Sequence, residues 1–190
     1  MAKYVYDITK DADLKKLNAF FDNLEQIFTS KKFKNFIADK CLKELDEIMA
    51  TNLSGFGDGE EHSGFTSKVE EYKRNNKKEI GDDYILIYNE TILTPEEMTW
   101  VSEKTKSNYP EGLSISKVIE YGTGLLGSPQ DDWEVNVNNY KGSWSYIDPD
   151  NNLRHTQGIS GKFIYLKLLQ TVQREFENWV IEYVGKNMEE

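Results

Sequence analysis

The chain has 190 residues, of which 38% are hydrophobic and 13% aromatic, enough apolar material for one domain with a substantial core. No run of about 18 apolar residues could cross a bilayer, and no apolar segment precedes a cleavage site at the N-terminus, so we expect neither a membrane span nor a signal peptide. The net charge of -10 argues against the basic surface with which nucleic-acid-binding proteins neutralise phosphates.

Two amphipathic helices are predicted at the N-terminus. Apolar residues recur at steps of three and four over residues 8–29, and Ser30 restarts the pattern. We interpret both stripes as packing surfaces, against each other or against a sheet. The one cysteine, Cys41, has no histidine nearby and is predicted to be a buried structural thiol. The first stripe consists of Leu14, Leu17, Phe20, Phe21, Leu24, Ile27 and Phe28, and the second of Phe33, Phe36, Ile37, Cys41, Leu45, Ile48 and Met49.

A glycine-rich acidic loop is predicted to follow the helices. Residues 54–64 contain four glycines and three acids, with no apolar period, and we expect an exposed, mobile connection. Its acids and His62 match no metal-loop spacing. The basic residues that come next alternate with acids, which is more typical of a solvated helix face than of a phosphate site. These basic residues are Lys68, Lys73, Arg74, Lys77 and Lys78, interleaved with Glu70, Glu71 and Glu79.

The second half of the chain alternates strand and helix patterns. A turn at 81–83 precedes a strand at 84–88, and Thr94 followed by Pro95 starts a helix that is expected to run to about Asn108, with Trp100 and Val101 buried. A short apolar element at 114–121 leads into glycines. Strands are predicted at 133–137 and 143–147, the latter joined through a turn at 148–152 to Leu153–Thr156. A long helix from Ile159, rich in apolar residues, should end near Gly185.

These patterns predict an α+β fold. A small, mostly antiparallel sheet is expected to be flanked by two N-terminal helices and a long C-terminal helix. We expect a single domain over residues 1–190, with a helical part at about 8–53, the loop at about 54–64 and an α+β part at about 80–185.

A glycine motif interrupts this second half. Gly122, Gly124 and Gly127 satisfy the G-x-G-x-x-G pattern of dinucleotide sites. That fingerprint requires a helix directly after the last glycine, whereas Ser128-Pro129 and a further strand pattern follow here. We therefore expect no nucleotide and no other cofactor, and interpret the glycines as a corner of the chain.

A second motif resembles a metal site. Asp148-x-Asp150-x-Asn152 begins like a calcium loop, but Leu153 replaces the required glycine at position six and Ile159 replaces the glutamate at position twelve. The segment is interpreted as a turn. A metal-assisted hydrolase that uses Asp148, Asp150 and His155 remains an alternative, although no motif marks a nucleophile.

The segment from about Lys117 to Gln170 resembles the neck family of tailed bacteriophages, also called head-tail joining, minor tail or tail-completion proteins. The similarity lies in the order of an apolar-Glu-aromatic-Gly-Thr-Gly element, a Trp-x-aromatic strand, a Thr-x-Gly and a Phe that opens the last helix. Members commonly carry Ala and Pro just before that Phe, where this chain has residues 159–162. The matching positions are Ile119, Glu120, Tyr121, Gly122, Thr123, Gly124, Gly127, Trp144, Tyr146, Thr156, Gly158 and Phe163.

The resemblance implies a structural protein without enzyme activity. It implies a small α+β subunit of a cyclic homo-oligomer, a hexamer or dodecamer, that joins and seals the DNA channel at the neck or the top of the tail. Its partners would be further copies and the neighbouring connector and tail proteins, with DNA only a passing occupant. It would assemble in the host cytoplasm and reside in a virion, a tail-like particle or a prophage product.

A ring subunit needs surfaces that meet its neighbours. A cyclic assembly uses two different patches, so apolar residues in exposed loops are candidates for the contact. Four such residues lie beside glycines: Phe56, Phe65, Leu125 and Leu126. Local packing under each loop is the alternative for these four. An acidic cytoplasmic module that binds a basic protein is a further alternative for the whole chain.

Overall fold

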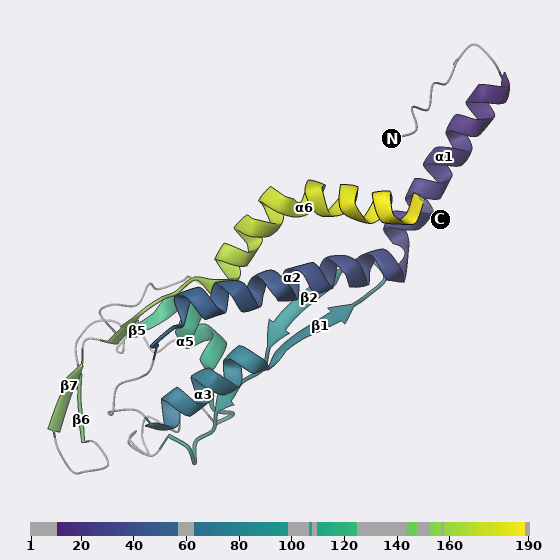
Figure 1. Cartoon of the computed structure of the whole chain (residues 1–190). Coiled ribbons are helices and arrows are strands. Elements are labelled where there is room, and N and C mark those ends of the chain that lie inside the picture. The colour runs from purple at the N-terminus through teal and green to yellow at the C-terminus, as the bar shows by residue number, and fades with distance from the viewer. Residues whose placement is uncertain are drawn as a thin grey trace.

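A computed structural model describes residues 11–56, 63–98, 107, 110–124, 144–147, 153–156 and 158–188. Within these ranges the chain has the predicted α+β fold, with helices beside short antiparallel strand pairs (Figure 1). The two N-terminal helices and the long C-terminal helix are confirmed.

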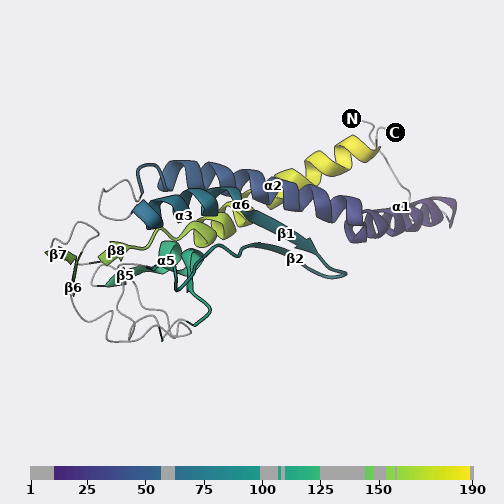
Figure 2. The same cartoon turned by 90° about the horizontal axis from the view of Figure 1, so that it is seen from below.

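Helices α1 (Asp11–Thr29) and α2 (Lys31–Asn52) are separated by Ser30, as the sequence predicted. The Ser30 hydroxyl accepts a hydrogen bond from the Phe33 N–H at 3.1 Å and donates to the Ile27 carbonyl at 2.7 Å. It therefore caps the start of α2 and also contacts the end of α1. Figures 1 and 2 both show α1 projecting away from the rest of the described chain.

The core lies where α2 meets α3 (Ser63–Arg74), α5 (Ile115–Tyr121) and α6 (Ile164–Met188). The stripe of α2 is buried as predicted, including the Cys41 thiol, whose pKa burial raises. Lys40 of α2 pairs with Glu182 of α6 at 2.7 Å, and the Phe33 and Tyr183 rings meet edge-on at 5.2 Å. The largest fully buried side chains are Tyr72, Leu45, Met49, Leu53, Leu93, Met98, Ile115, Ile119, Ile164, Val69 and Val118.

The strands within the described ranges form four antiparallel pairs. β1 (Asn76–Ile80) and β2 (Ile85–Asn89) form a hairpin around the predicted turn at 81–83; β2 corresponds to the predicted strand at 84–88, whereas β1 was not predicted. β6 (Trp144–Ile147) and β7 (Leu153–Thr156) form the hairpin that was predicted around the turn at 148–152. The other pairs join β3 (Ile92–Leu93) to β4 (Leu113–Ser114) and β5 (Gly122–Gly124) to β8 (Gly158–Ser160).

Two predicted elements are corrected by the structure. Lys77 and Lys78 lie on strand β1 rather than on a helix face, because this segment pairs with β2, and Lys78 reaches Asp39 of α2 at 2.5 Å. The C-terminal helix begins at Ile164 rather than Ile159, since Gly158–Ser160 pairs with β5. It continues through Gly185 to Met188 instead of ending there.

The packing predicted for two apolar stripes is partly wrong. On α1, Phe21 is 57% and Phe28 37% exposed, because the helix leaves the body. On α6, Leu166, Leu169 and Phe176 are exposed, because the helix buries its opposite side in the core. The residues on that buried side are Ile164, Leu168, Trp179 and Tyr183.

Some predicted elements are described only in part. At the predicted helix start, the Thr94 N–H donates to Glu97 Oε2 at 2.9 Å and the Glu97 N–H to Thr94 Oγ1 at 3.4 Å, a reciprocal capping box. Residues 95–97 form a turn, and residues 99–106, with Trp100 and Val101, lie outside the described residues, as does the strand predicted at 133–137. The predicted loop at 54–64 ends earlier than expected, since α3 begins at Ser63, and 57–62 are not described.

Candidate functional site at the junction of α5 and α6

The glycine stretch follows a short helix that is fixed at both ends. The Ser114 hydroxyl caps α5 by accepting from the Lys117 N–H at 3.4 Å. The helix buries Ile115, Val118 and Ile119. It ends at Gly122, which has a φ of 77° and donates its N–H to the Val118 carbonyl. Glycine adopts this backbone conformation without the steric cost that a Cβ brings, so Gly122 forms a corner of the chain.

Two distant parts of the motif meet beyond that corner. β5 and β8 pair antiparallel, with Gly122 opposite Ser160, Thr123 opposite Ile159 and Gly124 opposite Gly158. The pairing places the start of α6 directly beside the end of α5 (Figure 2).

Glu120 connects the two helices. Its side chain is only 8% exposed, and its two carboxylate oxygens accept the backbone N–H groups of Tyr165 at 3.0 Å and Leu166 at 3.1 Å. These N–H groups belong to the first turn of α6, where they have no partner within the helix. A carboxylate at this end is also favoured by the helix dipole. The glutamate of α5 therefore caps α6.

Backbone contacts close the junction. The Lys162 N–H donates to the Ile119 carbonyl at 2.7 Å, and the Phe163 N–H to the Glu120 carbonyl at 3.2 Å. Phe163 itself has a positive φ of 51°. A Cβ at Gly161 would lie 2.6 Å from the Glu120 carbonyl oxygen, so the two chain segments approach too closely for any side chain there. No sequence motif marks Gly161, although the departure from the usual Ala and Pro lies in this segment.

The aromatic positions of the motif lie on the neighbouring hairpin. Trp144 pairs with Thr156 across β6 and β7, and Tyr146 with Arg154. Tyr121 is half-buried at the end of α5. Gly127 lies outside the described residues.

The four interface candidates are placed unequally. Phe56 is half-buried, packs against the core, and has the Lys162 ammonium 5.3 Å from its ring centre. Phe65 belongs to α3. Leu125 and Leu126 lie outside the described residues, so the role of the four as subunit contacts stays a prediction.

Two buried phenols lie behind the junction. Burial raises the pKa of Tyr165 to about 12, and raises that of Tyr72 further, with added contributions from Tyr165 and Glu120. The two hydroxyls influence each other's pKa, yet neither makes a hydrogen bond of good geometry within the described part of the chain. Both phenols are therefore neutral at physiological pH.

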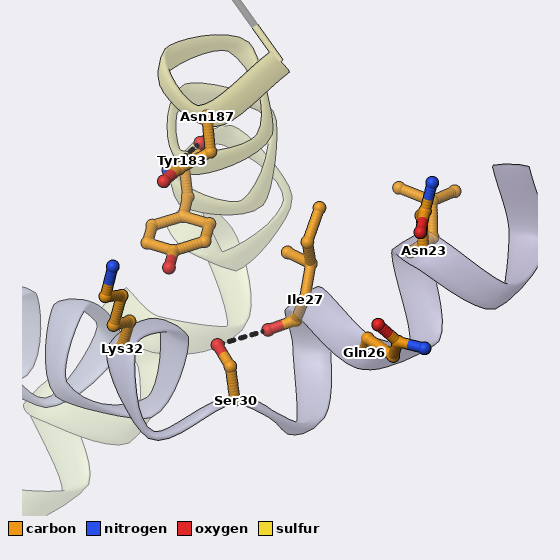
Figure 3. A pocket seen from close by; sticks show the side chains of 8 residues that line it. Asn23, Gln26, Ile27, Ser30, Lys32, Tyr183 and Asn187 are labelled. Carbon is orange, nitrogen blue, oxygen red and sulfur yellow. Dashed lines mark hydrogen bonds between the residues drawn. The ribbon is translucent and has the colours of Figure 1, made fainter. Parts of the chain in front are cut away.

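A hollow of about 510 Å³ lies where α1 diverges from α2 and α6 (Figure 3). The Tyr183 ring and Ile27 face each other across it, and Asn187 donates to the Tyr183 carbonyl at 2.8 Å. Polar and apolar side chains both line it. Its lining residues are Asn23, Leu24, Gln26, Ile27, Ser30, Lys32, Tyr183 and Asn187.

Only one residue of the hydrolase alternative lies within the described structure. His155 lies on β7 opposite Ser145, and Asp148 and Asp150 fall outside the described residues. No group of three metal-binding side chains occurs within the described ranges.

None of the helices described is long and apolar enough to cross a membrane. Comparisons with family models, with curated proteins and with solved structures found no match.

Proposed function

We propose that the chain is a structural subunit of a phage or phage-tail-like particle. It forms a ring at the neck, the head-tail junction or the top of the tail, where it joins and seals the DNA channel. The ring contains further copies of the chain and contacts the connector and tail proteins above and below.

The observation that carries the proposal is the joint position of the residues behind the family resemblance. Glu120 and Phe163, more than forty residues apart in the printed sequence, meet at one junction, and Gly122 turns the chain beside them. Glu120 supplies two acceptors to α6, which an apolar residue cannot do. Part of the residue order that resembles the neck family, namely Glu120, Gly122 and Phe163, therefore lies where α5 joins α6.

Charge supports the same proposal. A net charge of -10 suits a channel wall, because a negative surface repels the phosphates of passing DNA and does not hold them. The exposed apolar residues on α1 and α6 can form contacts between subunits.

Mass photometry and negative-stain imaging of the purified protein test the proposal. We expect closed rings at micromolar concentration, and we expect the protein in purified particles, bound to connector or tail-tube proteins. A strictly monomeric protein that is absent from such particles would overturn the proposal.

The glycine corner offers a second test. Gly122→Ala forces a side chain onto a backbone with φ 77° and ψ -166°, a region that essentially only glycine occupies, at a cost of roughly 1–3 kcal/mol. We expect a lower free energy of unfolding and a loss of rings. Intact folding and assembly in this variant would remove the central support for the family resemblance.

A further inference from the structure

The side of α6 that faces away from the core carries a row of exposed apolar side chains. Leu166 is 47%, Leu169 53%, Phe176 43% and Ile181 61% exposed. At 3.6 residues per turn these four fall within about 140° of the helix circumference. We call them the outer α6 face. Because the opposite side of α6 is buried in the core, this helix is apolar on two sides, which is typical of a helix covered on both.

Helix α1 has an apolar stripe of similar length. Its seven apolar residues run from Leu14 to Phe28, and the Phe21 side chain is 57% exposed. At 1.5 Å per residue α1 is about 28 Å long, and the outer α6 face extends over about 22 Å. One chain therefore carries two apolar helical surfaces that fit each other in length.

The direction of α1 separates it from the α6 of its own chain. The Ser30 backbone N–H donates to the Ile27 carbonyl at 3.2 Å, and its hydroxyl bonds to both helices, so the bend between α1 and α2 is held on both sides. α1 extends beyond the C-terminal end of α6 in both views (Figures 1 and 2), and the hollow of Figure 3 lies at the divergence.

We propose that α1 of one copy binds along the outer α6 face of the next copy. This inference rests on the proposed ring function and specifies how adjacent subunits are joined. The two surfaces differ, so the contact is heterologous, as a ring requires. α1 acts as an arm that passes from each subunit to its neighbour.

The charges on the two surfaces permit this contact. The polar positions within the outer α6 face are Gln170, Gln173 and Glu177, of which only the last is charged. The acids of α1, such as Glu25, therefore meet mainly neutral amides. In a chain with a net charge of -10, this keeps repulsion between copies low where they touch.

The area of the contact favours a ring over an isolated dimer. Half of the lateral surface of a 19-residue helix about 10 Å wide is roughly 450 Å². A single arm contact then buries about 900 Å² in total, below the roughly 1,200–2,000 Å² of stable complexes. In a closed ring each subunit takes part in two such contacts, once through its arm and once through its α6.

Crosslinking between two variants tests the contact directly. Phe21→Cys and Phe176→Cys proteins are mixed and treated with a short bis-maleimide. Cys41 is buried with a raised pKa, so it should react little. We expect a crosslinked dimer in the mixture at least fivefold above either variant alone. Phe21→Cys mixed with Leu86→Cys is the matched control, because Leu86 is 46% exposed but lies on β2, and it should give background only.

Charge substitutions test whether the contact holds the assembly together. Phe21→Asp and Leu169→Asp should each shift the assembly midpoint at least tenfold to higher concentration, and Leu86→Asp should leave it unchanged. All three residues are about half exposed, so circular dichroism and the urea midpoint should stay near the wild type. If Phe21→Asp fails to fold, the crosslinking result decides.

The outcomes separate this inference from the proposed function. Rings that persist in Phe21→Asp, or crosslinks no stronger than the Leu86 control, overturn the arm contact while the ring remains. Crosslinks within single chains of a Phe21→Cys/Phe176→Cys double variant, without any between chains, show that α1 folds back and also overturn it. A wild-type protein that never assembles overturns the ring itself.

Discussion

Glu120 is the residue on which the junction of α5 and α6 depends most directly. Its carboxylate accepts two N–H groups that are otherwise unpaired at the start of α6. Glu120→Ala leaves both part-buried groups without their acceptors, at about 1–2 kcal/mol for each. We expect the free energy of unfolding to fall by roughly 2–4 kcal/mol, measured by urea denaturation.

A matched control for this change is Glu177→Ala. Glu177 is an exposed glutamate on α6, so the same substitution there should alter stability by less than about 0.5 kcal/mol. Equal losses in the two variants would mean that the carboxylate of Glu120 does not cap α6.

Glu182 provides a pH-dependent contact between α2 and α6. Hydrogen bonds and ion pairs with Lys186 at 2.8 Å and Lys40 at 2.7 Å lower the pKa of Glu182 to about 2. Because the folded pKa lies below the ordinary 4.5, the stabilisation is present above that pH and is lost as the pH falls from about 4.5 towards 2. NMR titration of the carboxyl carbon should show the low pKa.

The lysine partners supply the control for this titration. Replacing both with methionine should return the pKa of Glu182 towards its ordinary value. In Glu182→Gln the free energy of unfolding should change less between pH 4.5 and 2 than in the wild type, because the contribution from titration of Glu182 is absent. A Glu182 pKa that is unaffected by the lysine substitutions would contradict the assignment.

The sequence was informative about residues whose partners are close in the chain. The break between the two helices at Ser30 and the burial of Cys41 follow from local periodicity, and both were predicted correctly, whereas the cap that Ser30 provides to α2 was not predicted. The role of Glu120 was not predictable in this way, because its hydrogen-bond partners lie 45 and 46 residues further along the chain. The resemblance marked Glu120 as important without giving the reason.

Among the secondary-structure elements, alanine substitutions at two glycines should change the stability of the fold in opposite directions. A Cβ at Gly161 would lie 2.6 Å from the Glu120 carbonyl oxygen, a backbone atom that cannot move without separating α5 from α6. Gly161→Ala should therefore cost about 1–3 kcal/mol. Gly185 lies within α6 with nothing within 4 Å of its added Cβ, so Gly185→Ala should stabilise by up to about 1 kcal/mol.

Thermal unfolding of the two variants, compared with the wild type, checks this pair. Opposite shifts of the melting temperature are expected. A neutral Gly161→Ala would show that the segment before α6 can move away from α5, and the junction would then be less rigid than the close approach indicates.

Where the predicted elements were wrong, contacts with other residues of the chain determine the observed secondary structure. The charged run at Lys77 and Lys78 has no helical or strand period of its own, and its pairing with β2 makes it a strand. Gly185 does not end α6, since the Glu182–Lys186 pair and the Asn187–Tyr183 hydrogen bond support the turns on either side. Glycine raises the cost of a helix by about 1 kcal/mol, which such contacts can offset.

For the whole molecule, periodicity identified which faces are apolar but not what covers them. The stripe of α2 and part of that of α6 meet in the core, whereas Phe21 of α1 and the outer α6 face remain exposed. The same amphipathic pattern is expected for a face that is covered within its own chain and for a face that is covered by another copy. The hydrophobic effect depends on the area removed from water and not on the partner that covers it. The arm contact between copies would bury these surfaces.

Ring assembly should become stronger as the salt concentration rises, whereas an interface held by ion pairs would become weaker. Each copy carries a net charge of -10, so copies repel one another at low ionic strength. At about 0.15 M salt the screening length is near 8 Å, compared with about 30 Å at 0.01 M, and repulsion between surfaces weakens while apolar burial persists. Rings should therefore form at lower protein concentration as sodium chloride rises from 0.01 to 0.3 M. Mass photometry over a dilution series measures this, and rings that dissociate on adding salt would show that ion pairs, rather than α1 on the outer α6 face, hold the subunits together.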